Sequence, residues 1–386
     1  MFHKRSYILK KNYKNPDIIL LMKRFCLIYL SIIFFSCSLQ KTDIGEGIIW
    51  ERNLNSSPSH GIEVHENSVY FSDSSGNIYS CWMDSGFLKW KRASGNKKIL
   101  SFFLVENGVA VIYKDTSNDS SLLRIYSFDN GIIKYETKIP FTPKESYLSD
   151  NGKIILHSSN SIITIDRKSL RYSITQLPIL FNIISVIKGD NSYLVIDEHS
   201  RIIETDLLFK YKRAFLSFNS TFMGNAVYYH GNLFLSTSSG IKGIHLPSKK
   251  ILSPIFLPSS SASMILSEDT SSLFIYSGSV QKIYFTGREE YTIVDNLSII
   301  EEPSKYLSPM FISKALKVLV TIDRNGYLNI LDSRSGHFIY SRYVGNIEKP
   351  FLKIAPDYSE KAIFIPLTSP AKILCYSLSY ALLKNK

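Results

Sequence analysis

The strongest constraint on this chain is a short pattern that recurs about eight times. Its clearest copies are Gly76 to Trp90 and Asn325 to Tyr340, where a turn, an apolar alternation, a polar corner ending in glycine and an aromatic residue follow one another. Weaker copies begin at Ser121, Asn160, Ser200, Ser239, Ser279 and Ala371. Short alternating runs bounded by Gly, Asn, Asp and Ser predict strands and turns, and no long amphipathic helix stands out. The fold class predicted is therefore all-β.

The spacing of the copies predicts how the strands are grouped. The residues just before each corner recur at steps of about 39 to 48 and are Trp82, Ser127, Asp166, Asp206, His245, Tyr284, Asp332 and Ser377. About 42 residues per unit leaves roughly ten for each of four strands with its turn. Such units cannot bury their faces alone and must stack in a ring, so we predict an eight-bladed β-propeller.

A bulky residue follows each clear corner glycine by four positions. Trp90, Tyr135 and Tyr340 occupy this place, and Ile174 stands there in a weaker copy. We expect these side chains to pack between neighbouring blades. The alternative is that they are ordinary strand aromatics, since the chain contains 24 Tyr and 23 Phe.

The two ends of the repeat region complement each other. The last copy runs into the C-terminus without room for its final aromatic strand, whereas Gly47 to Asn53 is an aromatic strand with no unit in front of it. Trp50 precedes Trp90 by about one repeat length. We therefore predict that the Trp50 strand completes the eighth blade and closes the ring, because closure leaves no sheet edge free.

The segment before the repeats has the organisation of an export signal. Lys23 and Arg24 precede an apolar run from Phe25 to Phe35 that is too short to span a bilayer as a helix, and Ser36 and Cys37 follow it. This ending resembles the lipobox of bacterial lipoproteins, which implies lipidation of Cys37 by a diacylglyceryl group and palmitate. The alternative is an uncleaved membrane anchor.

These observations divide the chain into three parts. We expect 1–36 to be a signal peptide whose true start is Met22, 37–46 to be the lipidated cysteine and its tether, and 47–386 to be the propeller. The signal segment carries about half of the formal net charge of +12. The rest of the chain is only mildly basic, which does not indicate nucleic-acid binding.

The corner pattern resembles the repeat of quinoprotein-like (PQQ-type) propellers, carried best by Gly76 to Trp90 and by Asn325 to Tyr340 with its Asp332, Ser335 and Gly336. Among these propellers, a lipid-anchored one with eight blades and N-terminal closure resembles the BamB family. That resemblance implies a non-catalytic scaffold on the outer membrane, facing the periplasm. It also implies a monomer within a complex, which assists the assembly of β-barrel proteins by binding a BamA-type subunit.

The resemblance also implies a contact loop between the third and fourth units. In this chain the loop is Thr175 to Asn182, with Leu177, Ile179 and Leu180 as apolar contacts. It lacks the arginine of the family's loop, and Phe215 to Asn225 lacks the acidic pair found in the family's next loop. The alternative is that Leu177 to Phe181 belongs to the first strand of the next blade.

Other functions are less well supported by the residues. A PQQ-dependent dehydrogenase of this fold uses a Trp-lined cofactor site and often adjacent cysteines, whereas this chain has three Trp and no adjacent Cys pair. We therefore expect no enzyme activity and no cofactor. His60 and His65, beside Glu63 and Glu66, are interpreted as solvated polar residues, so no metal is expected. A propeller lipoprotein that docks another envelope protein or a carbohydrate remains open.

Two cysteines lie within the repeats at similar places. Cys81 and Cys375 belong to the first and last units, which become neighbours in a closed ring. An oxidising periplasm permits a disulfide, but the geometry that a disulfide requires is narrow. Two buried free thiols are the favoured interpretation.

Overall fold

The computed structural model consists mainly of short β-strands joined by turns and loops. It describes residues 46–384 apart from 96, 116–119, 145–146, 151, 178–181, 216, 253, 256–262, 268–271, 277–278, 286–290, 300–309, 324 and 346–353. In this described part, no helix is long and apolar enough to cross a membrane.

The described strands group into eight antiparallel sheets of four. Blade 1 contains β2 (Glu63–His65), β3 (Ser68–Ser72), β4 (Ile78–Trp82) and β5 (Leu88–Arg92). Blade 2 contains β6 (Ile99–Val105), β7 (Gly108–Lys114), β8 (Ser121–Tyr126) and β9 (Ile133–Ile139). Blade 3 contains β10 (Tyr147–Asp150), β11 (Lys153–His157), β12 (Ser161–Asp166) and β13 (Tyr172–Gln176). Blade 4 contains β14 (Ile183–Lys188), β15 (Tyr193–Asp197), β16 (Ile202–Thr205) and β17 (Tyr211–Phe215).

The second half of the ring repeats this order. Blade 5 contains β18 (Phe222–Tyr229), β19 (Asn232–Thr237), β20 (Gly240–His245) and β21 (Lys250–Ile251). Blade 6 contains β22 (Ser263–Leu266), β23 (Ser272–Tyr276), β24 (Ser279–Phe285) and β25 (Tyr291–Ile299). Blade 7 contains β26 (Met310–Ser313), β27 (Val318–Ile322), β28 (Tyr327–Asp332) and β29 (Phe338–Tyr343). Blade 8 contains β30 (Ala355–Pro356), β31 (Ala362–Thr368), β32 (Ala371–Ser377) and β1 (Ile48–Asn53), and α3 (Leu378–Lys384) follows β32.

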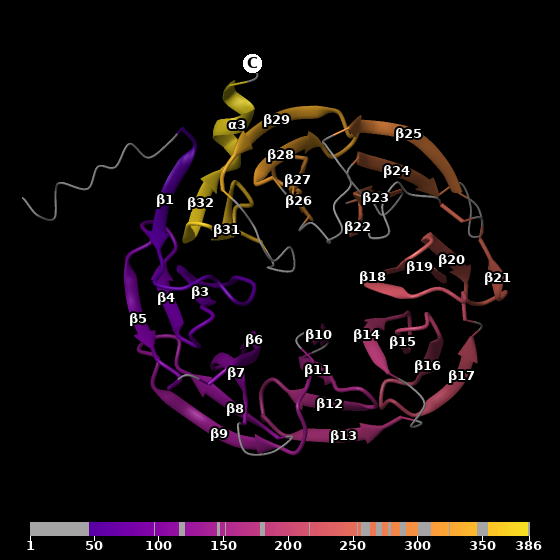
Figure 1. Ribbon diagram of the computed structural model, residues 1–386, viewed down its shortest axis with the longest axis horizontal. Coiled ribbons are helices and arrows are strands. Elements are labelled where there is room, and N and C mark those ends of the chain that lie inside the picture. The colour runs from indigo at the N-terminus through magenta and orange to yellow at the C-terminus, as the bar shows by residue number, and fades with distance from the viewer. Residues whose placement is uncertain are drawn as a thin grey trace, which may run out of the picture. The chain divides into compact units, whose positions relative to one another are not determined.

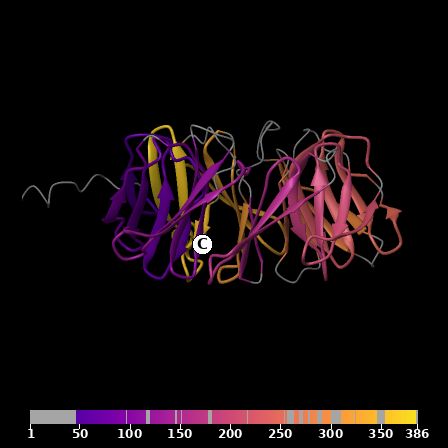
Figure 2. The same ribbon diagram turned by 90° about the horizontal axis from the view of Figure 1, so that it is seen from below.

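The blades follow one another around a ring (Figure 1). First strands such as β6, β10, β14 and β18 lie towards the centre, and outer strands such as β9, β13 and β17 run along the circumference (Figure 1). Seen from the side, the ring is one blade deep (Figure 2). The prediction of an all-β, eight-bladed propeller is confirmed, and every residue placed before a corner lies at or next to the end of the third strand of its blade.

The ring is closed by its N-terminal strand, as predicted. β1 pairs antiparallel with β32, with Ile48 opposite Tyr376, Trp50 opposite Cys375 and Asn53 opposite Lys372. The C-terminal strand would otherwise be an unpaired edge, so β1 completes the sheet that the end of the chain leaves incomplete.

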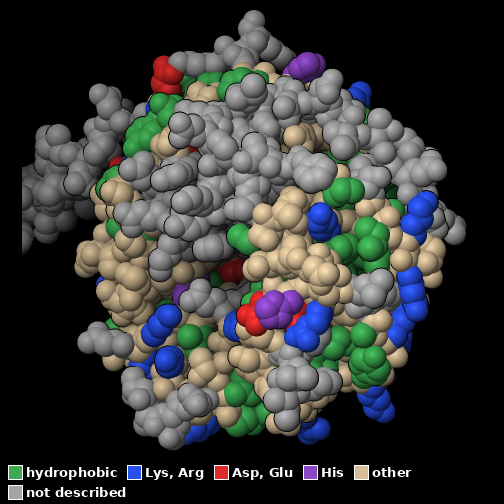
Figure 3. All heavy atoms as spheres, turned by 45° about the vertical axis from the view of Figure 1, so that its right-hand side comes forward, with side chains coloured by type: hydrophobic (Ala, Val, Ile, Leu, Met, Phe, Trp, Pro, Cys, Tyr) green, Lys and Arg blue, Asp and Glu red, His purple; other side chains and the backbone are tan. Residues whose placement is uncertain are grey.

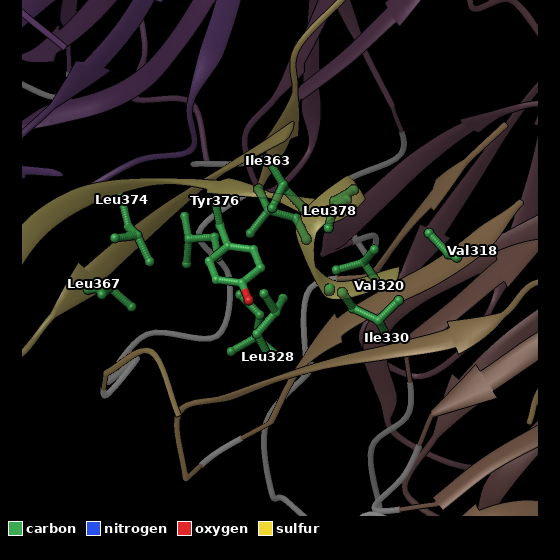
Figure 4. Close-up of a cluster of buried hydrophobic side chains, with 13 residues drawn as sticks. Val318, Val320, Leu328, Ile330, Ile363, Leu367, Leu374, Tyr376 and Leu378 are labelled. Atoms are coloured by element: carbon green, nitrogen blue, oxygen red, sulfur yellow. The ribbon is translucent and has the colours of Figure 1, made fainter. Parts of the chain in front are cut away.

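The apolar core lies between adjacent blades rather than in one central body. The cluster between blades 7 and 8 is built around Tyr376, which lies among Leu328 of β28, Ile363 of β31 and Leu374 of β32 (Figure 4). All four side chains are fully buried. Burial of each side chain of this size contributes about 2–3 kcal/mol, and the pattern recurs at each blade boundary, so the ring is stabilised by stacking.

Candidate functional site

The corner between the third and fourth strands is held by a side chain that caps its own turn. Asp332 Oδ1 accepts hydrogen bonds from the backbone N–H groups of Arg334 and Ser335, at 3.0 and 2.6 Å, and from the Ser335 hydroxyl. The N–H of Gly336 closes the turn on the Asp332 carbonyl. Burial raises the pKa of Asp332, but the hydrogen bonds from Ser335 and Arg334 stabilise the carboxylate and together lower its pKa below the usual value. The Asp-x-x-Ser-Gly pattern is therefore a turn motif.

The corner glycine receives the tryptophan of the preceding blade. Gly86 lies against the Trp50 ring, and Trp50 Nε1 donates to the Met83 carbonyl at 2.8 Å. Trp90 repeats this contact one blade further on: it lies against Gly131 and donates to the Phe128 carbonyl at 2.8 Å. The predicted packing of aromatics between blades is confirmed for these residues, and Trp50 closes the ring through both its strand and its side chain.

The corner motif weakens around the ring. Leu170, Phe209 and Lys249 adopt positive φ angles of 60°, 61° and 58° where the clear copies have glycine. Ile174, at the aromatic position of blade 3, is 39% exposed, whereas Trp50 and Trp90 are 5% and 6% exposed. Non-glycine residues in this conformation cost free energy, so the weaker copies keep the turn geometry at the expense of local strain.

The ring has two distinct faces. Each corner lies beside the first turn of its own blade, as when Met83 N–H donates to the Asn67 carbonyl and Ser333 N–H to the Lys317 carbonyl. We call this side the corner face. The other side carries the turns between second and third strands, together with the loops that link one blade to the next, and we call it the interblade face.

The loop between blades 3 and 4 lies on the interblade face and is anchored at both ends. The N–H of Leu177 donates to the Asn160 carbonyl at 2.8 Å, and the N–H of Ile183 donates to the Ser159 carbonyl at 2.7 Å. Leu177 is 6% exposed and packs in the core cluster between these blades. Its side chain is therefore part of the core and holds the start of the loop in place. Ile179 and Leu180 lie outside the described residues.

A polar network joins this loop to blade 4. Asn182 accepts a hydrogen bond from Lys144 Nζ at 3.0 Å and donates to Glu198 Oε2 at 2.7 Å. Lys144 Nζ also donates to the Ile183 carbonyl. Glu198 lies in the turn after β15, and its carbonyl accepts from the N–H of Phe222 at the start of blade 5. One network therefore connects three blades on the interblade face.

Two basic side chains of this region are withdrawn from water: Lys144 is half-buried and His157 is buried. Burial is the main reason that the pKa of Lys144 is lowered, although Glu198 opposes the shift. Burial, together with the nearby Lys144 charge, lowers the pKa of His157 to about 4, so this imidazole is neutral near pH 7. The sequence analysis did not identify Lys144, His157, Asn182 and Glu198 as a cluster, because these residues are far apart in the chain and none belongs to a recognisable motif.

The structure also describes the two cysteines of the repeats and the side chains that could bind a metal ion. Cys81 and Cys375 are free and buried, and both pack in the cluster between blades 8 and 1. Burial raises the pKa of Cys81 to about 11 and that of Cys375 to about 12. In the part of the chain that the structure describes, no three His, Cys, Asp or Glu side chains are placed to hold a metal ion. Cys37 lies outside the described residues.

Comparisons with known proteins identify the fold. No family model matches the chain, and no curated protein matches it by sequence. Among solved structures, the computationally designed protein Ika8 matches with a TM-score of 0.66 and 10% identity, over 86% of this chain and all of that chain. BamB from Moraxella catarrhalis matches with a TM-score of 0.58 and 13% identity, over 86% of this chain and 97% of that chain. The chain therefore resembles BamB as a propeller.

Proposed function

We propose that this protein is a BamB-like lipoprotein, anchored through Cys37 in the outer membrane, that binds a BamA-type subunit and assists the assembly of β-barrel proteins. The observation that carries this proposal is the closed ring of eight blades, completed by the N-terminal strand and resembling BamB over nearly the whole length of that protein. The signal-like segment ending at Cys37 supports the anchor.

A scaffold of this kind acts by holding a partner in position. The loop between blades 3 and 4 is suited to that task because its ends are fixed by backbone hydrogen bonds and by the network of Asn182 with Lys144 and Glu198. Residues that are already held in place, such as Leu177 and Asn182 at the two ends, lose little conformational entropy on binding. We place the partner contact on this loop, with Ile179 and Leu180 as its apolar side chains and buried Leu177 as its support.

Affinity isolation of the native protein from detergent-solubilised envelopes tests this proposal. We expect a BamA-type barrel subunit to be captured with the wild-type chain and to be lost when Ile179 and Leu180 are both replaced by Glu. A matched control is Ile132→Glu, since Ile132 is 59% exposed on the corner face. Capture of no barrel-assembly component by the wild type would contradict the proposal, and equal loss in the control would contradict the placement of the contact.

A further inference from the structure

Among the residues that the structure describes, exposed apolar side chains are concentrated on the corner face. Eighteen large hydrophobic residues of the described chain are exposed. Only Tyr327 and Tyr343 of these lie at the interblade end of their strands, and Ile174 lies mid-strand. The others belong to the corners, to the first turns beside them, or to the ends of strands and the helix at that face. The most exposed at the corners are Phe87, Leu208 and Ile132, at 72%, 65% and 59%.

Lysine follows the exposed apolar residues on three of these corners. The sequence reads Phe-Leu-Lys at 87–89, Ile-Ile-Lys at 132–134 and Leu-Leu-Phe-Lys at 207–210. Lys89 Nζ donates to the Ser68 hydroxyl at 2.8 Å and lies 4.3 Å from the centre of the Trp82 ring. Lys134 Nζ donates to the Asn107 carbonyl at 3.3 Å. Both amines therefore donate to neutral oxygens of the protein. Elsewhere on the molecule, Figure 3 shows further Lys and Arg side chains exposed at its edge.

The chain that leads back to Cys37 also leaves from the corner face. Ile48 lies opposite Tyr376 at the corner end of β32, and the Gly47 carbonyl accepts the N–H of Ser377 at 2.8 Å. Only nine residues separate Cys37 from Gly47. Even fully extended, a stretch of this length spans at most about 35 Å, so a lipid on Cys37 would keep the start of β1 near the bilayer.

We propose that the corner face docks on the phospholipid surface into which the lipid on Cys37 inserts, with its apolar side chains in the headgroup region and its lysines at the lipid phosphates. This inference rests on the lipid anchor of the proposed function. Apolar and aromatic residues flanked by lysine suit the membrane interface, where anionic lipids also attract basic side chains. Because the corners recur around the ring, they match a planar surface better than a compact partner that touches one side.

Docking in this orientation assigns separate tasks to the two faces. The interblade face, with the loop between blades 3 and 4, is turned towards the aqueous side. A protein partner can then reach that loop while the corner face stays in contact with lipid. Asp84 and Asp129 lie on the same corners as Phe87 and Ile132 and offset part of the lysine charge. The apolar contacts therefore contribute most of the docking, and the lysines add contacts with the phosphates.

The native tryptophans allow a direct test. Trp82 is 42% exposed on the corner face, whereas Trp50 and Trp90 are 5% and 6% exposed. The mature lipidated protein is reconstituted in phosphatidylethanolamine–phosphatidylglycerol vesicles, with either ordinary or brominated acyl chains. We expect tryptophan emission to fall in the brominated vesicles and this loss to disappear in the Trp82→Phe variant.

A reporter on the other face is the matched control. Tyr343 is 53% exposed at the interblade end of β29, so Tyr343→Trp in the Trp82→Phe chain should emit equally in both kinds of vesicle. Vesicle flotation without quenching of Trp82, or equal quenching of the Tyr343→Trp reporter, would overturn the docking while leaving the anchor intact. Failure to float would overturn the anchor and the docking together. If Trp82 is not quenched and the protein is a dimer that Phe87→Glu converts to a monomer, the corner face binds a second copy of the chain instead of lipid.

Discussion

Gly86 and Gly131 are required at their corners for two separate reasons. Their φ angles of 68° and 66° are left-handed, a conformation that residues with a Cβ adopt at a cost. A Cβ on Gly86 would also lie 2.6 Å from the Trp50 ring, and one on Gly131 would lie 2.7 Å from the Trp90 ring. The glycine is therefore part of the contact between blades as well as of the turn.

Gly86→Ala should lower the free energy of unfolding by about 2–4 kcal/mol, since backbone strain and overlap with Trp50 add together. Gly95 separates the two effects, because its φ is 70° but nothing lies within 4 Å of its Cβ position. Gly95→Ala should therefore cost only about 1 kcal/mol. Urea unfolding curves of both variants check this prediction, and equal midpoints would show that the contact with Trp50 contributes nothing.

His157 should make stability depend on pH in the acid range. Burial lowers its pKa to about 4 in the folded protein, whereas an unfolded chain titrates histidine near 6.5. The unfolded state then binds more protons between these values, so the contribution is present above about pH 6.5 and is lost as the pH falls towards 4.

We expect His157→Gln to remove about 3 kcal/mol of the loss of stability that the wild type shows between pH 7 and pH 4. Other groups also titrate in this range, so the informative quantity is the difference between the two proteins in urea unfolding at each pH. Parallel pH profiles would contradict the buried, neutral state of His157.

Among the structural elements, β1 is the one on which ring closure depends. It supplies the outer strand of blade 8, and its Trp50 reaches the corner of blade 1. Trp50→Ala should cost about 3–5 kcal/mol, whereas Trp82→Ala, which truncates a side chain that is 42% exposed, should cost less than about 1 kcal/mol. Deleting Gly47 to Asn53 should cost more than Trp50→Ala. Thermal melts of the three variants compare these losses of stability. An unchanged melting temperature after the deletion would refute closure of the ring by β1.

The sequence predicted the elements better than the surfaces. The eight units, the corners and the closing strand could be predicted because turn chemistry and strand alternation are local. Leu177 was expected to contact a partner, but the structure buries it. The sequence could not distinguish the two cases, because an apolar residue between two strands can face either solvent or the neighbouring blade. The network of Lys144, Asn182 and Glu198 could not be predicted, since the stacking of blades brings it together and no spacing in the chain encodes it.

In the arrangement that we propose for the whole molecule, one face of the ring meets lipid and the other meets a protein partner, and both contacts depend on the lipid anchor at Cys37. Replacing Cys37 with Ala should move the protein from the detergent phase to the aqueous phase on phase partitioning. Persistent recovery of the variant in the detergent phase would show that the uncleaved apolar segment is the anchor and that the assigned start of the mature chain is wrong.

The most direct measurement of the proposed function is the amount of β-barrel protein in the outer membrane after depletion of this chain. Because a scaffold positions its partner without carrying out a reaction, depletion should lower the yield of large barrels without abolishing it. The wild-type gene should restore the yield, and Cys37→Ala should not. Normal levels of every outer-membrane barrel protein in depleted cells would contradict the assignment of this propeller to barrel assembly.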